Sequence, residues 1–573
     1  MTGGTRVATG LDVLVSERFR RLDGRRVGLI ANPTTVDRQL RHAADLLASA
    51  PVVTHAALFG PEHGVRADAQ DLIGVPSGHD SKTGVVVHSL YGSEFASLTP
   101  TGEQIAGLDV LVFDVQDVGS RYYTFAATMK YAMIAAARAG IGFMVLDRPN
   151  PIGGAIVEGP TIRPGFASFV GAHPLPIRHG MTVGELARLF RADLGLDLDL
   201  EVVPCEGLTR AMTWAETGLP WVLPSPNMPT PETAAVYPGG CLVEGTNLSE
   251  GRGTTRPFEL WGAPWLDPDR LATELNRALR DAGCSEGLVL RPCGFRPTFQ
   301  KHVGSTCGGV QIHVTDPTAF RPAAVYATAL AVARNLDPGR FAWRTEVYEF
   351  VSDPIAIDLL FGSGRERALI DEAGPPSGWA RDLFEGEWAR ESAEFAESRE
   401  PFLLYGPGSS SSRAVLAFTL LVDGAVARPL RLGFADLAAM PEGDQIPDVA
   451  RFHPGRDGDG VSLRSLLDRA GIDRAATHLT LHADRDDFHA SIPLAEVADR
   501  GMVVYRSGGG PLPKERGGPI RFLIRDPSTC RSADLDDCAN VKYLSRIELT
   551  IGKGRDSRPL DDAEHEALHA GEK

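Results

Sequence analysis

Apolar segments that alternate with helical segments over residues 10–225 constrain the fold of this chain more than any other feature. Residues 27–31, 110–114 and 141–147 are nearly all apolar, as expected of strands whose two faces are both buried in a parallel sheet. A helix is predicted over residues 123–139, between the last two of these strands. Strands and helices that alternate in this way are typical of an α/β fold, so we predict a Rossmann-like N-terminal domain.

The turn after the first predicted strand argues against a dinucleotide cofactor. Residues 30–35 read Ile-Ala-Asn-Pro-Thr-Thr and contain no glycine, whereas the dinucleotide fingerprint has three glycines in this turn. A helix is predicted over residues 40–50, and the strand that follows it ends at Phe59. The Rossmann-like layout is therefore expected to serve a different chemistry.

A companion domain is predicted over residues 226–405, where helices and strands are mixed. Helices are expected over residues 268–282 and 323–336, and the alternating residues 310–314 indicate a strand. The first of these helices begins with a proline, and Asp267 is its predicted N-cap. We therefore expect an α+β fold for this part of the chain.

The rest of the chain differs in composition. Residues 406–413 are rich in glycine and serine and read as a flexible linker. Residues 414–553 are predicted to form a β-rich domain of mixed α+β type with short helices. A charged tail at residues 554–573 is expected to be solvated.

Charge and cysteine usage exclude several classes of function. The net charge of -16 and the isoelectric point near 5.5 argue against a nucleic-acid partner. No apolar run approaches the roughly 20 residues that span a bilayer. Seven cysteines without a Cys-X-X-Cys pair argue against a disulfide framework or a zinc site, so no metal is expected. Residues 1–6 lack the apolar core of a signal peptide, so the chain as written is expected in the cytoplasm, or secreted if its true start lies upstream.

Glu62 and His63 are the leading candidates for catalysis. They lie in a glycine-bounded loop directly after the strand that ends at Phe59. In α/β folds, the loops beyond the carboxyl ends of the strands carry most ligand and catalytic residues. A carboxylate next to an imidazole can donate, accept or relay a proton.

Two further polar clusters also follow predicted strands. Asp114, Gln116, Asp117 and Arg121 come after the strand at 110–114, where they can face a cleft. Asp117 can equally cap a helix, and an aspartate and an arginine of this cluster can form a structural pair. The same two interpretations apply to Asn150, which follows the strand at 141–147.

The remaining clusters lie in loops of the chain up to residue 253. Thr182 and Glu185 match a capping box, which leaves the nearby His179 unexplained. Residues 244–253 form a polar loop whose glycines allow a ligand to approach the backbone closely. The polar side chains of this loop that we consider for binding are Glu244, Asn247, Glu250 and Arg252.

Several long motifs in a fixed order identify a family. The strings GPEHGVR, DVQDVGSRYYT, LDRPNPIGG, PIRHGMTVGELA, PSPNMPT and YPGGCLVEGTNLSEGRGTTRPFE resemble the NamZ (YbbC-like) exo-β-N-acetylmuramidases over residues 10–405. The resemblance implies an exo-acting glycoside hydrolase that releases N-acetylmuramic acid from the non-reducing ends of peptide-free peptidoglycan fragments. Its partners would be muro-disaccharides or glycan ends. It also implies an active site between the two domains, a catalytic glutamate at Glu62, and no cofactor for the hydrolase.

The chemistry of glycoside cleavage agrees with this assignment. The reaction needs an acid at the leaving oxygen and commonly a second carboxylate nearby. Glu62 is the expected acid or acid/base, and His63 can orient it. For the second carboxylate, Asp117 is the first candidate, followed by Glu244 and Glu250; the acetamido group of the substrate could serve as the nucleophile instead.

The substrate also needs polar contacts. The lactyl carboxylate of muramic acid calls for a cation, and Arg252 or Arg121 could meet it in a bidentate pair. Asparagine amides and an imidazole are suited to sugar hydroxyls. The expected substrate-contacting residues are Asp114, Gln116, Arg121, Asn150, His179, Asn227, Glu244, Asn247, Glu250 and Arg252.

The second region resembles a different family. The strings LLVDG, GVSLRSLL, PLPKERGGPIR and NVKY within residues 414–553 resemble the molybdopterin-binding domain of sulfite oxidase-type oxidoreductases. A catalytic member needs a cysteine thiolate on molybdenum, upstream of the second string. This chain has no cysteine between residues 308 and 529, and a surface or capping role is favoured over a ligand role for His453. We therefore do not expect bound molybdopterin; a molybdopterin-dependent oxidoreductase and a noncatalytic muropeptide-binding protein remain the alternatives.

Overall fold

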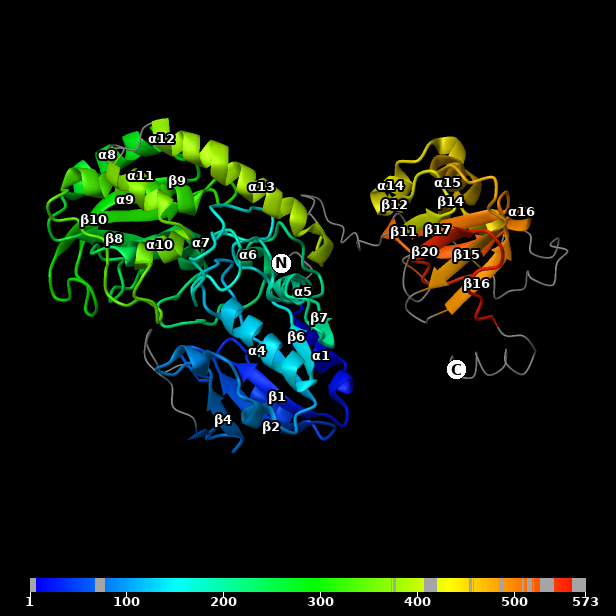
Figure 1. The fold of residues 1–573 in the computed structure, drawn as a ribbon, viewed down its shortest axis with the longest axis horizontal. Coiled ribbons are helices and arrows are strands. Elements are labelled where there is room, and N and C mark those ends of the chain that lie inside the picture. The colour runs from blue at the N-terminus through cyan, green and yellow to red at the C-terminus, as the bar shows by residue number, and fades with distance from the viewer. Residues whose placement is uncertain are drawn as a thin grey trace. The chain divides into compact units, whose positions relative to one another are not determined.

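The chain divides into two compact units, Met1–Gly408 and Ser409–Lys573 (Figure 1). The structure is a computed structural model. It describes residues 7–558 except 67–77, 373, 375–377, 407–419, 453–455, 457, 484–487, 508–509, 513–517, 519 and 526–539. The predicted linker, the end of the predicted tail and His453 therefore fall wholly or mostly outside the described residues.

A seven-stranded sheet forms the N-terminal part of the first unit. Its order is β3-β4-β2-β1-β5-β6-β7, and all neighbouring strands pair in parallel except β3 with β4. The strands are β1 (Arg26–Ala31), β2 (Thr54–Gly60), β3 (Gly78–His79), β4 (Val86–Ser89), β5 (Val110–Asp114), β6 (Gly142–Leu146) and β7 (Leu200–Val203). This sheet confirms the predicted Rossmann-like layout.

Helices cover both faces of this sheet because its strands are apolar on both sides. Leu29 of β1 belongs to the core under the helices α1 (Gly10–Ser16) and α2 (Ala43–Ala48). The adjacent Ile30 belongs to the core under the helices of the other face. The helices of this part of the chain are α1, α2, α3 (Gly102–Ile105), α4 (Phe125–Ala139), α5 (Val183–Asp193) and α6 (Trp214–Thr217).

The helix predicted over residues 40–50 is shorter than expected. Leu40 has a φ of 60°, in the left-handed region that a helix cannot contain. His42 then takes the N-cap position and its ring accepts a hydrogen bond from the backbone of Ala44. By contrast, the capping box of Thr182 and Glu185 at the start of α5 is confirmed.

The companion lobe consists of a three-stranded antiparallel sheet packed against helices. The sheet order is β8-β10-β9, and Asp267 caps α8 as predicted by accepting a hydrogen bond from the backbone of Arg270. The elements are α7 (Pro231–Gly240), β8 (Leu260–Ala263), α8 (Pro268–Asp281), β9 (Leu288–Phe295), β10 (Cys307–Val314), α9 (Pro322–Leu336), α10 (Ala356–Phe361), α11 (Arg365–Glu372), α12 (Gly378–Arg381), a π-helix (Asp382–Trp388) and α13 (Ala389–Ser398).

One hydrophobic core runs through both lobes of the first unit. Tyr122, which precedes α4, and Phe125, its first residue, belong to the same buried cluster as Tyr237 and Phe258 of the companion lobe. Edge-to-face ring contacts join Tyr122 to Tyr237 and Tyr237 to Phe258, with centroids 5.9 and 4.8 Å apart. Apolar packing therefore fixes the companion lobe against the carboxyl ends of the strands.

The second unit is β-rich with short helices, as predicted. One sheet has the order β12-β11-β20-β15-β16, and the other has the order β13-β14-β17-β18 with β19 paired to β17. The elements are β11 (Leu420–Gly424), β12 (Leu430–Leu432), α14 (Phe434–Ala438), β13 (Gln445–Ile446), β14 (Asp459–Ser462), α15 (Leu463–Ala470), β15 (His478–Ala483), β16 (Phe488–Pro493), α16 (Leu494–Val497), β17 (Gly501–Ser507), β18 (Gly510–Pro511), β19 (Arg521–Ile524) and β20 (Arg546–Thr550). Within the part of the chain that the structure describes, we find no helix of a length and apolarity suited to crossing a bilayer.

Candidate active site

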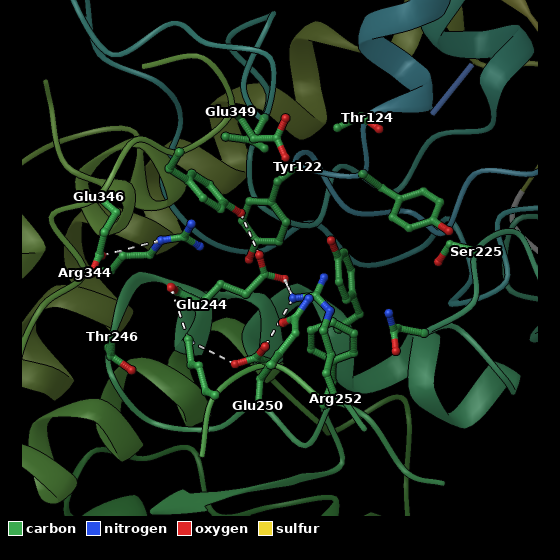
Figure 2. Close-up of a pocket in the computed structure, with 18 of the residues that line it drawn as sticks. Tyr122, Thr124, Ser225, Glu244, Thr246, Glu250, Arg252, Arg344, Glu346 and Glu349 are labelled. Carbon is green, nitrogen blue, oxygen red and sulfur yellow. Dashed lines mark hydrogen bonds and ion pairs between the residues drawn. The ribbon is translucent and has the colours of Figure 1, made fainter. Parts of the chain in front are cut away.

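A cavity of about 690 Å³ lies in the first unit, where the loop after β2 and the start of α4 meet loops of the companion lobe (Figure 2). Its polar wall contains many of the residues singled out from the sequence. Those that line it are Glu62, His63, Asn227, Glu244, Asn247, Glu250 and Arg252. Further polar residues of the wall are Tyr123, Thr124, Ser225, Gln300, Lys301, Arg344, Glu346, Tyr348 and Glu349.

Glu62 is placed by the turn that ends β2. The backbone of Gly64 donates a hydrogen bond to the Pro61 carbonyl, and His63 has a φ of 70°, so the chain reverses tightly around Glu62. The carboxylate is buried and accepts a hydrogen bond of 2.7 Å from the hydroxyl of Thr124. Thr124 precedes α4 but its side chain does not cap that helix, so the hydroxyl serves Glu62 instead.

Tyr91 connects Glu62 to a second acid of the cavity. Its hydroxyl donates a hydrogen bond of 3.3 Å to Oε2 of Glu349. Burial, followed by the negative charges of Glu62 and Glu349, raises the pKa of Tyr91 far above its ordinary value. The carboxylates of Glu62 and Glu349 therefore both lie close to the buried phenol of Tyr91.

The backbone at Glu349 is held in an uncommon conformation. Glu349 and Phe350 have φ values of 45° and 69°, in the region that side chains other than glycine rarely adopt. Phe350 packs against Tyr91, Phe95 and Phe169 with ring centroids 6.0 to 6.3 Å apart. Backbone strain of this kind persists where surrounding packing enforces it, and it is concentrated at functional sites.

Two further carboxylates of the cavity are neutralised by cations (Figure 2). Nη1 of Arg252 lies 2.9 Å from Glu244 and 3.3 Å from Glu250, and Nζ of Lys301 lies 3.0 Å from Glu250. Burial opposes the charge of Glu250, but the Lys301 and Arg252 cations outweigh it and lower its pKa to about 2. Tyr348 donates a hydrogen bond of 2.8 Å to Glu244. These residues form a rigid ionic wall.

Asn247 shapes the cavity through the backbone. Its amide donates to the Arg340 carbonyl and its oxygen accepts from the backbone of Ala342, at 2.8 and 3.0 Å. These bonds fix the segment that carries Arg344 into the cavity wall. Asn227 lines the cavity from the loop before α7.

Three of the sequence candidates lie outside this lining, within the protein interior. Asp114 is fully buried in an ion pair with Arg148, whose Nε lies 2.5 Å away. Gln116 donates to the backbone carbonyls of Asp117 and Pro149. Arg121 donates to three backbone carbonyls, and burial lowers its pKa to about 10.

Asp117, Asn150 and His179 also lie outside the lining. Asp117 accepts a hydrogen bond from the backbone of Gly119, and its carboxylate is 3.5 Å from Nε2 of His179. His179 is fully buried, and its Nδ1 accepts from the backbone of Met181. Asn150 donates to the carbonyl of the same Met181. These contacts hold together the loops that follow β5 and β6.

Several residues in and beside the cavity were not predicted from the sequence. They are Thr124, Arg344, Tyr348 and Glu349 of the lining, and Tyr91, which follows β4 and contacts Glu349. For Thr124 the available signal was the string GSRYYT after β5, of which it is the last residue. The segment at 344–349 has no feature that links it to Glu62.

Comparison with known proteins identifies the family. Residues 27–232 match the family described as exo-beta-N-acetylmuramidase NamZ, N-terminal, and residues 235–405 match its C-terminal counterpart. Over 400 residues the chain is 44% identical to the peptidoglycan beta-N-acetylmuramidase NamZ of Bacillus subtilis (strain 168), which covers 70% of this chain and 92% of that protein. The chain belongs to the NamZ family. It is therefore a glycoside hydrolase of the exo-β-N-acetylmuramidase type, as the motifs indicated.

A solved structure supports the NamZ fold. The chain is 35% identical to a DUF1343 family protein from Bacteroides fragilis NCTC 9343, with a TM-score of 0.61. The match covers 70% of this chain and 99% of that protein. The uncovered part of the present chain agrees in extent with the second unit.

The second unit is similar to a different group of proteins. Residues 459–554 match the family described as oxidoreductase molybdopterin binding domain. Over 138 residues the chain is 27% identical to the uncharacterized oxidoreductase YuiH of Bacillus subtilis (strain 168), covering 23% of this chain and 65% of that protein. The resemblance of this region to molybdopterin-binding domains is thereby confirmed.

Proposed function

We propose that the first unit removes N-acetylmuramic acid from the non-reducing ends of peptidoglycan fragments, with Glu62 as the general acid. The observation that carries the proposal is the position of Glu62: buried in the wall of a 690 Å³ cavity, directly after a strand, and held by Thr124. That volume lies within the roughly 300–1,000 Å³ of small-molecule sites. The name of the Bacillus subtilis relative supports the substrate class.

The cavity can supply the two functions that glycoside cleavage requires. Glu62 in its protonated form delivers a proton to the glycosidic oxygen, which lets the leaving sugar depart as an alcohol. The sugar that stays behind then carries positive charge in an oxocarbenium-like state. Carboxylates in the same wall stabilise that charge, and water then adds to the anomeric carbon and gives its proton to one of these carboxylates.

We propose Glu349 as the second carboxylate. Glu244 and Glu250 are both bound to Arg252, and Glu250 also to Lys301, so their charge is largely neutralised. Glu349 shares the phenol of Tyr91 with Glu62 and lines the same cavity, and this shared contact is the reason for choosing it. Asp117, the first candidate from the sequence, lies outside the cavity lining and is therefore assigned a supporting role in the loop after β5.

Product analysis with two disaccharides tests the proposed reaction. The full-length chain should release N-acetylmuramic acid from a disaccharide that has muramic acid at its non-reducing end. It should leave intact the disaccharide with the two sugars in the reverse order, which serves as the matched control. Cleavage of the control at an equal rate, or release of no muramic acid from the first disaccharide, would overturn the proposal.

We propose that the second unit has no molybdenum-dependent activity. The resemblance calls for a thiolate upstream of β14, and the sequence has no cysteine between residues 308 and 529. The described residues of this unit include no thiol; Cys530 and Cys538 lie outside them. Metal analysis of the full-length chain tests this: the proposal predicts negligible molybdenum, and stoichiometric molybdenum would contradict it.

A further inference from the structure

We propose that Arg344 binds the lactyl carboxylate of the muramic acid residue and thereby makes the enzyme prefer muramic acid to N-acetylglucosamine. The inference rests on the proposed function, because it takes the 690 Å³ cavity as the site for the terminal sugar. It replaces Arg252 and Arg121, the two arginines that the sequence pointed to. Arg121 bonds backbone carbonyls in the protein interior.

The other cations in the described lining of the cavity are already engaged. Arg252 lies between the carboxylates of Glu244 and Glu250. Lys301 contacts Glu250 at 3.0 Å and the Val243 carbonyl at 3.1 Å. A substrate carboxylate that approached Arg252 would meet the buried carboxylates of Glu244 and Glu250, and one that approached Lys301 would meet that of Glu250.

Arg344 is held in place but weakly paired. Its backbone donates a hydrogen bond of 2.9 Å to the Gly245 carbonyl, and its guanidinium carbon lies 5.0 Å from the ring centroid of Tyr348. Its Nε is 3.9 Å from the carboxylate of Glu346, whose side chain is 77% exposed. Its Nη2 reaches the Val347 carbonyl at only 3.5 Å.

These contacts leave Arg344 suited to an incoming anion. Exposed ion pairs at such distances contribute little, so a substrate carboxylate can displace Glu346 at small cost. Stacking on Tyr348 keeps the planar guanidinium in one orientation, and a fixed fork is what bidentate carboxylate binding needs. Figure 2 shows Arg344 and Glu346 on the same side of the cavity, next to the ionic wall at Glu244.

Muramic acid carries a free carboxylate that N-acetylglucosamine lacks. When a peptide is attached, this carboxylate becomes an amide and loses its charge. A contact with Arg344 therefore selects for muramic acid and also against fragments that still carry peptide. Arg344 thereby distinguishes a sugar with a free lactyl carboxylate from one whose lactyl group is absent or amidated.

This contact is tested by comparing two forms of the enzyme, each assayed on the same two substrates. The full-length wild type and Arg344→Met are assayed on p-nitrophenyl β-N-acetylmuraminide and on the same compound with its lactyl group as a methylamide. In the wild type, the amide should lower kcat/KM by about 10- to 100-fold, the effect of losing a charge-assisted bidentate pair. In Arg344→Met the acid should be cleaved as slowly as the amide, with the change mainly in KM.

Arg340→Met provides the matched control. Arg340 lies in the same segment, is paired with Asp337 and is not part of the cavity lining. This variant should keep the full discrimination between acid and amide. Arg344→Lys should recover part of it, since it restores the charge without the fork. The ratio of the two substrates on one preparation is independent of the folded fraction.

The outcomes separate the two proposals. If the wild type cleaves the acid and Arg344→Met retains the wild-type discrimination, the role of Arg344 is overturned and the muramidase proposal stands. If the wild type cleaves neither muramic acid compound, the proposed function fails and the role of Arg344 fails with it.

Discussion

Replacing Lys301 by methionine should destabilise the first unit, because the buried carboxylate of Glu250 loses one of the cations that keep it charged. Glu250 is buried, and its pKa of about 2 in the folded protein compares with an ordinary value of 4.5. This difference corresponds to about 3 kcal/mol of stability at neutral pH. Without Lys301, the carboxylate of Glu250 depends on its ion pair with Arg252, and Arg252 is also paired with Glu244.

We therefore expect Lys301→Met to cost about 3 kcal/mol at pH 7, as is typical when one partner of a buried pair is removed. The pKa of Glu250 is depressed by folding, so its contribution is complete above about pH 4.5 and declines as the pH falls toward 2. At pH 3 the cost should be about half as large. The double variant with Glu250→Gln should recover part of the loss at pH 7.

Urea unfolding followed by tryptophan fluorescence measures this effect in the full-length chain. All seven tryptophans lie between residues 214 and 388, so their signal reports the first unit alone. Lys82→Met is the control, because Lys82 makes an exposed ion pair with Asp45, and it should change the midpoint little. A cost for Lys301→Met that equals the control, or that grows as the pH falls, would show that Lys301 does not stabilise the charged form of Glu250.

Two other substitutions test the hydrogen bond to Glu62 and the buried ion pair of Asp114. Thr124→Val should lower kcat by at least about tenfold with little change in KM or in the urea midpoint, because Glu62 loses its hydroxyl donor; an unchanged kcat would contradict this role, and Thr124→Ser should restore activity. Arg148→Met should cost about 3–5 kcal/mol in urea unfolding, because Asp114 is left buried without its cation. Adding Asp114→Asn should recover part of that loss, and no recovery would count against the pair.

The sheet could be predicted because its strands are unusually apolar. The segments at 27–31 and 110–114 are buried on both faces, and few other structures accommodate such segments between helices. The helix predicted at 40–50 was too long because local backbone geometry at Leu40, which the apolar pattern does not report, delays its start. The apolar pattern of a sequence therefore predicts which segments are buried better than it predicts the residue at which a helix begins.

The site was predictable where one loop carries it. Glu62 follows a strand, and Glu244, Glu250 and Arg252 share one glycine-rich loop, so sequence proximity signals spatial proximity. Glu349 reaches the same cavity from nearly 290 residues beyond Glu62, and the packing of the two lobes that brings it there leaves no local pattern. Such partners emerge only from the folded structure.

Polar clusters next to the candidate site were harder to separate from it. Asp114 and Arg121 follow a buried strand, as catalytic residues do, yet Asp114 is paired with Arg148 and Arg121 donates to backbone carbonyls. Buried polar groups need partners whether or not they have a function. A sequence shows the polar groups without showing those partners.

The dependence of Glu62→Gln activity on the leaving group tests the proposed role of Glu62 as the general acid. A general acid is needed for a sugar leaving group, whereas p-nitrophenolate departs without a proton. If Glu62 is the acid, Glu62→Gln should lose at least about a hundredfold in kcat on the muramic acid disaccharide and far less on the p-nitrophenyl muraminide. Glu94→Gln, an exposed residue outside the cavity lining, should match the wild type on both. An equal loss on the two substrates, or no loss on the disaccharide, would contradict the assignment of Glu62 as the acid.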